Sequence, residues 1–225
     1  MQFELTDFNG FGRVAPLPLV REIEVALEGL LLPVKASDQA GKQGRLIFDP
    51  VGANEAIKTA LAGQGWSQRP RIPREWSAFG VDVDFDKQGV LVEVQFSNYP
   101  FLSNNVMRAN LFFAERVALP EVGAVKCAVV VTKAKLFEAS NSTLYYEQAV
   151  RQIQLLLTSA SIHLPLRVLG LMAERGAIAP AVFTSYHTSR QSRTVLQQRR
   201  VEVLVGGGGA PREVERLELQ PTDQL

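Results

Sequence analysis

Four polar side chains suited to metal and water chemistry recur at alternate positions in the middle of the chain: Asp82, Asp84, Glu93 and Gln95. Around them, apolar and polar residues alternate from Val81 to Phe96, with one interruption at the polar stretch 86–89. Period-two alternation on both sides of a short turn predicts a β-hairpin. Because successive side chains of a strand point to opposite faces, the four polar groups are expected on one face.

The expected register of this hairpin brings carboxylates together. With the turn at 86–89, Asp84 pairs with Leu91 and Asp82 pairs with Glu93. Like charges that face each other across a sheet repel, unless a cation or several hydrogen-bond donors lie between them. The pattern therefore favours a bound divalent cation.

Magnesium is the cation that this set of oxygens predicts. It prefers carboxylate and carbonyl oxygens with retained water, and the expected ligands are Asp84, Glu93 and the main-chain carbonyl of Val94. Such an ion activates water and neutralises charge on a phosphate during phosphodiester hydrolysis, and Gln95 would position the attacking water. The spacing alone also fits an edge hairpin whose outer face is simply polar.

The elements around the hairpin predict an α/β fold with a mixed sheet. Helical spacing of apolar residues occurs at 17–32, 53–62, 104–118 and 142–159, the last with Asn141 or Ser142 as its N-cap. Strands are expected at 124–132, 166–171, 181–186 and 201–205, with an extended loop at 67–75 and a polar loop at 187–198. Because a helix separates the strands 124–132 and 166–171, they are expected to be parallel neighbours.

Composition indicates an ordinary globular domain. The 225 residues are 46% hydrophobic and 21% charged, which is enough apolar material for one large core over residues 1–205. Four consecutive glycines from Gly206 then predict a linker, so residues 206–225 form either a frayed tail or one extra strand. No run of eighteen apolar residues and no basic, apolar leader is present, so a cytoplasmic protein without a membrane segment is expected.

Charge gives only a local indication of nucleic-acid binding. A net charge of +1 supplies no global attraction to phosphate. Arginines cluster in two stretches, which are candidate phosphate contacts or simply solvated segments: Arg69, Arg71 and Arg74, and then Arg190, Arg193, Arg199 and Arg200. The single cysteine, Cys127, lies in an apolar stretch and is expected to be a buried small side chain rather than a nucleophile.

Three long blocks of sequence carry a family resemblance. KASDQAGKQGRLIFDPVGANEAIK (35–58), LVEVQFSNYPFLSNN (91–105) and ASNSTLYYEQA (139–149) are similar to the BglII family of restriction endonucleases, and weaker similarity extends from Met1 to about Thr194. That family belongs to the PD-(D/E)XK nuclease superfamily and has Glu-x-Gln where many members have Glu-x-Lys. The resemblance implies an α/β core of mixed sheet flanked by helices, with a smaller β-sandwich subdomain. It also implies catalytic roles for Asp84, Glu93 and Gln95.

The same resemblance implies a homodimer that binds double-stranded DNA and cleaves a palindrome, AGATCT, with Mg²⁺, leaving a 5′-phosphate and a 3′-hydroxyl. The positions that match its DNA-contacting loops are Ser97, Asn98, Asn141, Ser142, Arg190, Gln191, Ser192 and Arg193. Asn presents a donor and an acceptor to an adenine edge, and Ser addresses several bases. Two positions depart from the family: Gln191 replaces a Tyr, and Arg69 replaces an active-site Asn and becomes a candidate phosphate contact.

Three other functions remain open from the sequence. A repair or junction nuclease of the same superfamily would recognise DNA structure instead of sequence. A DNA-binding module that has lost cleavage is favoured by Arg69 but opposed by the intact Asp84, Glu93 and Gln95. A metal-free α/β protein would show no stabilisation by magnesium.

Overall fold

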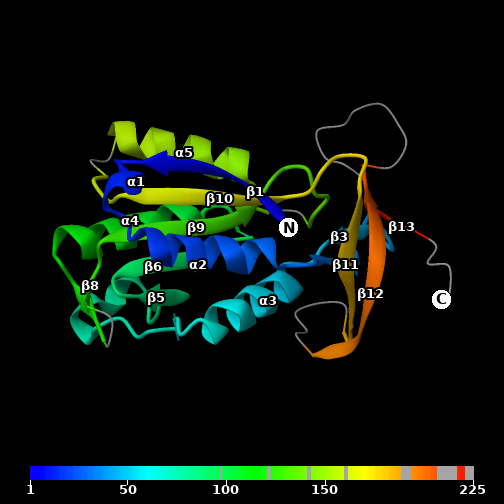
Figure 1. Ribbon diagram of the computed structural model, residues 1–225, viewed down its shortest axis with the longest axis horizontal. Coiled ribbons are helices and arrows are strands. Elements are labelled where there is room, and N and C mark those ends of the chain that lie inside the picture. Colours follow the sequence, from blue (N-terminus) through cyan, green and yellow to red (C-terminus); the bar gives the residue numbers. More distant parts are fainter. Residues whose placement is uncertain are drawn as a thin grey trace.

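A six-stranded mixed sheet forms the larger part of the computed structural model (Figure 1). The structure describes residues 1–96, 98–120, 123–140, 143–159, 162–188, 194–206 and 217–220. In spatial order the strands are β1 (Gln2–Phe8), β10 (Leu166–Met172), β9 (Cys127–Lys133), β6 (Val90–Val94), β5 (Phe85–Lys87) and β4 (Ser67–Gln68). The strands β6, β9 and β10 are parallel, and the outer strands are antiparallel to their neighbours. The parallel pairing of β9 with β10 confirms the predicted crossover.

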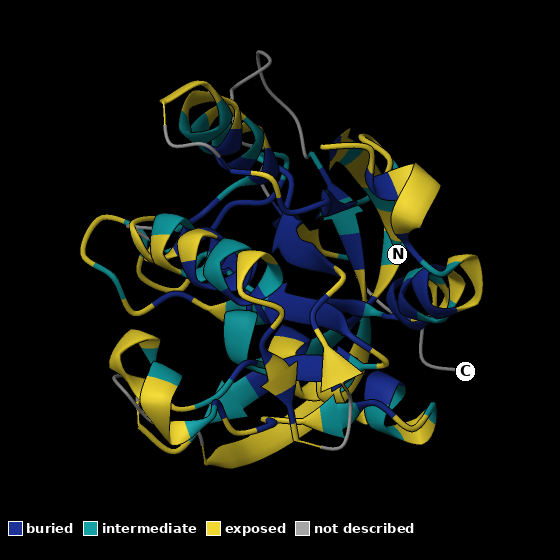
Figure 2. Ribbon diagram, turned by 90° about the vertical axis from the view of Figure 1, so that its left-hand side faces the viewer, coloured by how far each residue is buried: buried dark blue, intermediate teal, exposed yellow. Residues whose placement is uncertain are grey.

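Helices cover both faces of this sheet. The helices α2 (Leu17–Glu28) and α3 (Pro50–Gly63) pack with the side of β6 that presents Val90 and Val92. The helices α4 (Phe101–Ala114) and α5 (Tyr146–Ser159) pack with the opposite side, which presents Leu91. The sheet is therefore buried between two layers whose outer surfaces are exposed (Figure 2). Shorter elements are α1 (Phe11–Val14), the 3-10 helix η1 (Arg74–Phe79), β7 (Ala118–Leu119) and β8 (Gly123–Ala124).

A second sheet closes into a small barrel beside the larger one. Its strands are β11 (Ile178–Tyr186), β12 (Val195–Val205), β13 (Leu217–Leu219), β3 (Leu46–Phe48) and β2 (Leu32–Ala36). The smaller β subdomain is thus present, and it forms a closed barrel where a sandwich was expected. Of the two alternatives for residues 206–225, an extra strand is observed, because β13 pairs with β12 and buries Leu217.

Long-range pairing moved several predicted boundaries. The first helix ends at Glu28, not at Leu32, because Leu32 begins β2, a strand that pairs with β3 and β11. The strand predicted at 201–205 begins already at Val195, because β12 pairs with β11 along nearly its whole length. Residues 197–200 are polar and the whole stretch 195–200 is exposed, which suits an exposed strand as well as a loop. Among the described residues, no helix is long and apolar enough to span a membrane.

The predicted cap of α5 was wrong. The helix begins at Tyr146, so neither Asn141 nor Ser142 can be its N-cap. Instead, the residues just before it continue the sheet, since Tyr145 forms an isolated parallel bridge with Lys133. Tertiary pairing therefore overrode the capping preference of Asn and Ser.

The predicted register of the central hairpin was also wrong, because each residue of β6 pairs with a residue of β5 two positions further along the chain than predicted. Lys87 pairs with Val90, so the turn has Gln88 and Gly89 at its centre. Both residues have positive φ, 53° and 85°, as a type I′ turn requires, and glycine adopts this conformation at no steric cost. The shift preserves which side chains share a face, because the pairing moves by an even number of residues.

Lys133, at the end of β9, is buried with only 1% of its surface exposed, and burial lowers its pKa to about 7, although Glu147 opposes this shift. Its ammonium group lies over the rings of Phe48 and Tyr145. In the unfolded chain a lysine stays protonated to about pH 10.4, so between pH 7 and that value the unfolded state binds more protons than the folded state.

The wild-type protein should therefore gain stability relative to Lys133→Met as the pH rises from 7 to 10. We expect a relative gain of roughly 3 kcal/mol, measured by urea unfolding of both proteins across this range. A constant difference between the two proteins would contradict the lowered pKa.

Candidate active site

Asp84 and Glu93 lie near each other on the hairpin. The pairing of β5 with β6 begins at Phe85 and Val92, and Asp84 and Glu93 are the residues next to this pair, where the sequence had predicted Asp84 opposite Leu91. The negative charge of Asp84 acts on Glu93. The Oδ2 atom of Asp84 accepts a hydrogen bond from the main-chain N–H of Val94 at 2.8 Å. Glu93 is buried, with 5% of its surface exposed, and Asp84 is half-buried. The corrected register thus brings the two predicted metal-binding carboxylates closer than the predicted one.

Burial raises the pKa of both carboxyl groups. For Glu93, burial is the largest cause, the guanidinium of Arg108 opposes it, and the negative charge of Asp84 adds to it. For Asp84, burial is again the largest cause, and the N–H of Val94 and the charge of Arg108 oppose it. Carboxyl groups whose ionised forms are disfavoured by burial, and for Glu93 also by the charge of Asp84, are stabilised in those forms by a nearby cation. This electrostatic strain is the observation by which the site fits Mg²⁺.

The donor set is small but chemically suitable. Among the described residues, no group of three or more His, Cys, Asp and Glu side chains is arranged to hold a metal ion. The expected ligands are instead two carboxylates and the carbonyl of Val94, and Mg²⁺ commonly completes such a set with water. The third carboxylate of the predicted face, Asp82, forms an ion pair with Arg69 at 2.6 Å.

Helix α4 contributes two side chains that the sequence analysis missed. Arg108 donates a short hydrogen bond to Glu93 and a second one, at 3.2 Å, to the carbonyl oxygen of Phe79. Asn105, one turn earlier, donates from Nδ2 to Oε1 of Gln95 at 3.3 Å. Two residues three positions apart on the helix therefore contact two residues two positions apart on the strand. Two polar residues at helical spacing in a largely apolar segment were the signal that could have revealed them.

Gly80 makes room for Arg108. A Cβ atom at this position would lie 2.6 Å from Nη1 of Arg108, and the φ of 131° is one that side chains rarely adopt. The glycine therefore allows the guanidinium to approach the backbone before the hairpin.

Gln95 and Arg69 both lie beside the carboxylates. The main-chain N–H of Gln95 donates to Val131 at 2.8 Å, which extends the pairing of β6 with β9. Arg69 has a φ of 50°, and its N–H donates to the carbonyl oxygen of Asp84 at 2.9 Å. Its side chain is 74% exposed, so the guanidinium borders the site from the solvent side.

Most of the predicted DNA-binding residues lie outside the described part of the chain. These are Ser97, Asn141, Ser142, Arg190, Gln191, Ser192 and Arg193. Asn98 is described: it has a φ of 51°, is exposed, and accepts the N–H of Phe101 at the start of α4. Arg199 and Arg200 lie on the exposed part of β12. The structure thus brings together Asp84, Glu93, Val94, Gln95 and Arg69, and leaves the base-contacting set as a prediction.

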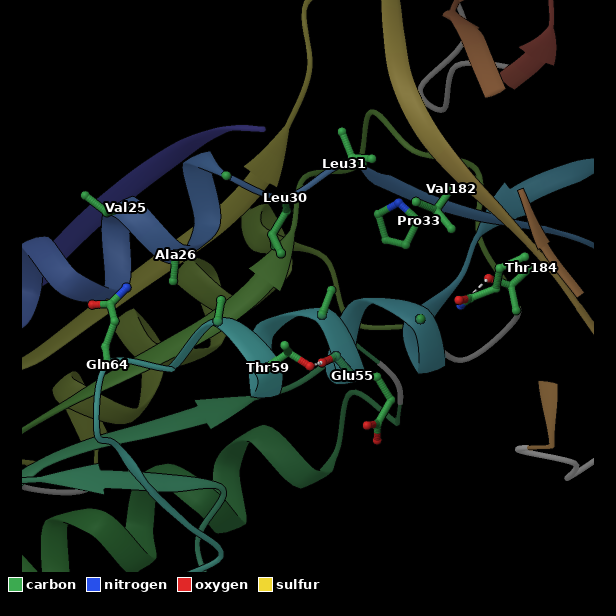
Figure 3. Close-up of a pocket in the computed structure, with 15 residues that line it drawn as sticks. Val25, Ala26, Leu30, Leu31, Pro33, Glu55, Thr59, Gln64, Val182 and Thr184 are labelled. Carbon is green, nitrogen blue, oxygen red and sulfur yellow. Dashed lines mark hydrogen bonds between the residues drawn. The ribbon is translucent and has the colours of Figure 1, made fainter. Parts of the chain in front are cut away.

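A cavity of about 660 Å³ lies elsewhere, between α2, α3 and the barrel strand β11 (Figure 3). Its labelled lining residues are largely apolar, and its polar groups are partly used internally: Thr59 donates to the carbonyl oxygen of Glu55, and Gln198 donates to Thr184. None of the predicted site residues lines it. The acidic site is therefore a surface beside the hairpin and not the interior of this cavity.

A mixed sheet between helices, with Asp84 and Glu93 near each other on the hairpin of β5 and β6, defines a nuclease of the PD-(D/E)XK type. The chain belongs to the family described as restriction endonuclease BglII/BglIII, whose model matches residues 15–171. It is 43% identical over 202 residues to the type II restriction enzyme BglII of Bacillus subtilis, covering 90% of each chain.

Solved structures give the same result. The crystal structure of BglII complexed with a DNA 16-mer matches with a TM-score of 0.92 and 39% identity, over 98% of this chain and 100% of that one. The crystal structure of free BglII matches with a TM-score of 0.74 and 35% identity, over 98% and 99% of the two chains. These matches confirm the predicted fold class and the predicted family.

Proposed function

We propose that this type II restriction endonuclease hydrolyses both strands of duplex DNA at AGATCT, with Mg²⁺ held by Asp84, Glu93 and the carbonyl of Val94. The observation that carries the proposal is the position of Asp84 and Glu93 next to the same residue pair of the hairpin, with the pKa of each raised by burial. The similarity to BglII, one of whose structures contains DNA, supports the choice of substrate. We place this activity in the cytoplasm, where cellular DNA would be accessible to it.

The chain's own residues would orient the reaction. When bound, the metal ion lowers the pKa of water and offsets the charge that builds on the phosphate. Gln95 has no basic group, so its amide, held by Asn105, would orient the attacking water without accepting its proton. The water oxygen would bond to phosphorus while the bond from phosphorus to the 3′-oxygen breaks. The attacking water would lose its proton to bulk solvent, and the 3′-oxygen would take a proton from solvent, which leaves a 5′-phosphate and a 3′-hydroxyl. Arg69, at the rim, would contact the phosphate backbone.

Two copies of the chain would be needed for this substrate. A palindrome has two-fold symmetry, and a symmetric dimer presents one active site to each strand. We therefore propose a homodimer, in which each copy supplies its own Asp84 and Glu93.

A digest of a sequenced plasmid tests the proposal. With Mg²⁺ we expect discrete fragments whose two strands are cut at symmetric positions within AGATCT, and no cleavage after chelation of the metal by EDTA. Fragments without a shared sequence would favour a repair or junction nuclease. Specific gel shifts without any cleavage would favour a DNA-binding protein that has lost its activity.

A further inference from the structure

Lys133 joins two segments that are distant in the sequence. Its Nζ donates to the carbonyl oxygens of Phe96, at 3.2 Å, and Leu144, at 3.1 Å, and makes a short hydrogen bond to the hydroxyl of Thr143. Three acceptors match the three N–H donors of an ammonium group. A neutral amine would keep two N–H donors, so Lys133 can join the two segments in its protonated and in its neutral form.

Further bonds hold the same segments in place. The hydroxyl of Thr143 donates directly to the carbonyl oxygen of Phe96 at 2.6 Å, and Thr132 on β9 donates to the carbonyl oxygen of Leu144 at 3.2 Å. The rings of Tyr145 and Phe48 lie 4.7 and 5.4 Å from Nζ of Lys133 and enclose the group. A buried lysine is costly, and its oxygen partners here are two carbonyls and a hydroxyl, so stability alone is a poor explanation for it.

The positions of these contacts in the chain are informative. The carbonyl group of Phe96 belongs to the peptide bond that leads into Ser97 and Asn98, and Thr143 directly follows Asn141 and Ser142. We name 97–98 and 141–142 the reading segments, because these are the residues expected to contact bases. Lys133 is bonded to the residue before one segment and to the residues after the other.

We propose that Lys133 is a positioning residue for sequence recognition: it holds the main chain at Phe96, before one reading segment, against Thr143 and Leu144, after the other. This rests on the proposed function. The catalytic hairpin has an independent support, because Glu93 and Val94 lie in the ladder between β6 and β9 and the N–H of Gln95 bonds to Val131. Loss of the Lys133 contacts should therefore reduce discrimination between DNA sequences more than it changes the chemistry of cleavage.

Substitutions at both ends of the contact test this role. Lys133→Met removes the donors and keeps the length of the side chain, and Thr143→Val removes the hydroxyl and keeps the shape. Thr143→Ser retains the hydroxyl and is the conservative partner of Thr143→Val. Lys58→Met, on the exposed surface of α3, is the matched control for the loss of one lysine charge.

The measurement is equilibrium binding, without Mg²⁺, to the duplex mapped by digestion and to a duplex with one base pair of the site changed. For Lys133→Met and Thr143→Val we expect the ratio of the two affinities to fall by about 10-fold or more, because misplaced base contacts lose their discrimination. The affinity for DNA without the site should stay unchanged, and Thr143→Ser and Lys58→Met should keep the wild-type ratio.

The outcomes of these binding measurements distinguish a failure of the Lys133 proposal from a failure of the proposed function. A wild-type ratio in folded Lys133→Met and Thr143→Val, or an equal loss of affinity for every duplex, overturns the proposal. If Lys133→Met does not fold by circular dichroism, Thr143→Val decides the question alone. If the wild-type protein itself shows no preference for any duplex, the proposed function fails, which is a different result.

Discussion

Asp84→Asn is expected to lower Mg²⁺-dependent DNA cleavage by roughly 10³-fold or more, because it removes a charged ligand from the predicted metal site. The free energy of unfolding without Mg²⁺ should rise or stay unchanged. The amide oxygen of Asn can still accept the N–H of Val94, and the negative charge that raises the pKa of Glu93 is gone. Substitution of a metal ligand lowers activity and leaves stability intact, whereas substitution of a purely structural residue would lower both.

Two measurements check this result. Single-turnover cleavage of plasmid DNA gives the loss of rate, and thermal unfolding with and without Mg²⁺ gives the stabilisation by the ion, which the substitution should remove. Asp86→Asn is the matched control. Asp86 is buried two residues further along the same hairpin, and burial raises its pKa to about 7, so a neutral side chain is tolerated there. Undiminished cleavage by Asp84→Asn would refute the predicted metal site.

The polar face of the hairpin was predictable because it depends only on local alternation. Even with the wrong turn, Asp84 and Glu93 remained on a shared face, since the true pairing differs by two positions. Which carboxylates face each other depended on the φ values of Gln88 and Gly89, which the composition of the stretch 86–89 did not specify. Local pattern thus identified the residues, and turn geometry determined their partners.

The supporting residues were not predictable in the same way. Arg108 reaches Glu93 only because α4 crosses the sheet at that point and Gly80 leaves space for the guanidinium. Lys133 reads in the sequence as the polar end of a strand, and its three oxygen partners come from segments 10 to 37 residues away. Such contacts follow from tertiary packing, which periodicity and residue preference do not encode.

The ion pair of Arg108 with Glu93 leads to a large expected effect on folding. Both side chains are almost fully buried, with 7% and 6% of their surfaces exposed. Arg108→Met fills a similar space but leaves the carboxyl group of Glu93 in a dry site without its counter-charge. Removing one partner of a buried ion pair typically costs about 3–5 kcal/mol of unfolding free energy. We expect a loss of this order in urea unfolding without Mg²⁺ at neutral pH.

A second substitution separates charge from packing. If the cost arises from the uncompensated carboxylate, Glu93→Gln in the Arg108→Met background should recover most of it, because a neutral amide needs no counter-charge. Arg21→Met, which removes an exposed arginine paired with Glu28 on the surface of α2, should change stability little. Were the double variant as unstable as Arg108→Met alone, the loss would come from packing around the guanidinium. Arg108 would then be a structural residue of α4 and not the counter-ion that keeps Glu93 buried and ready to bind a metal ion.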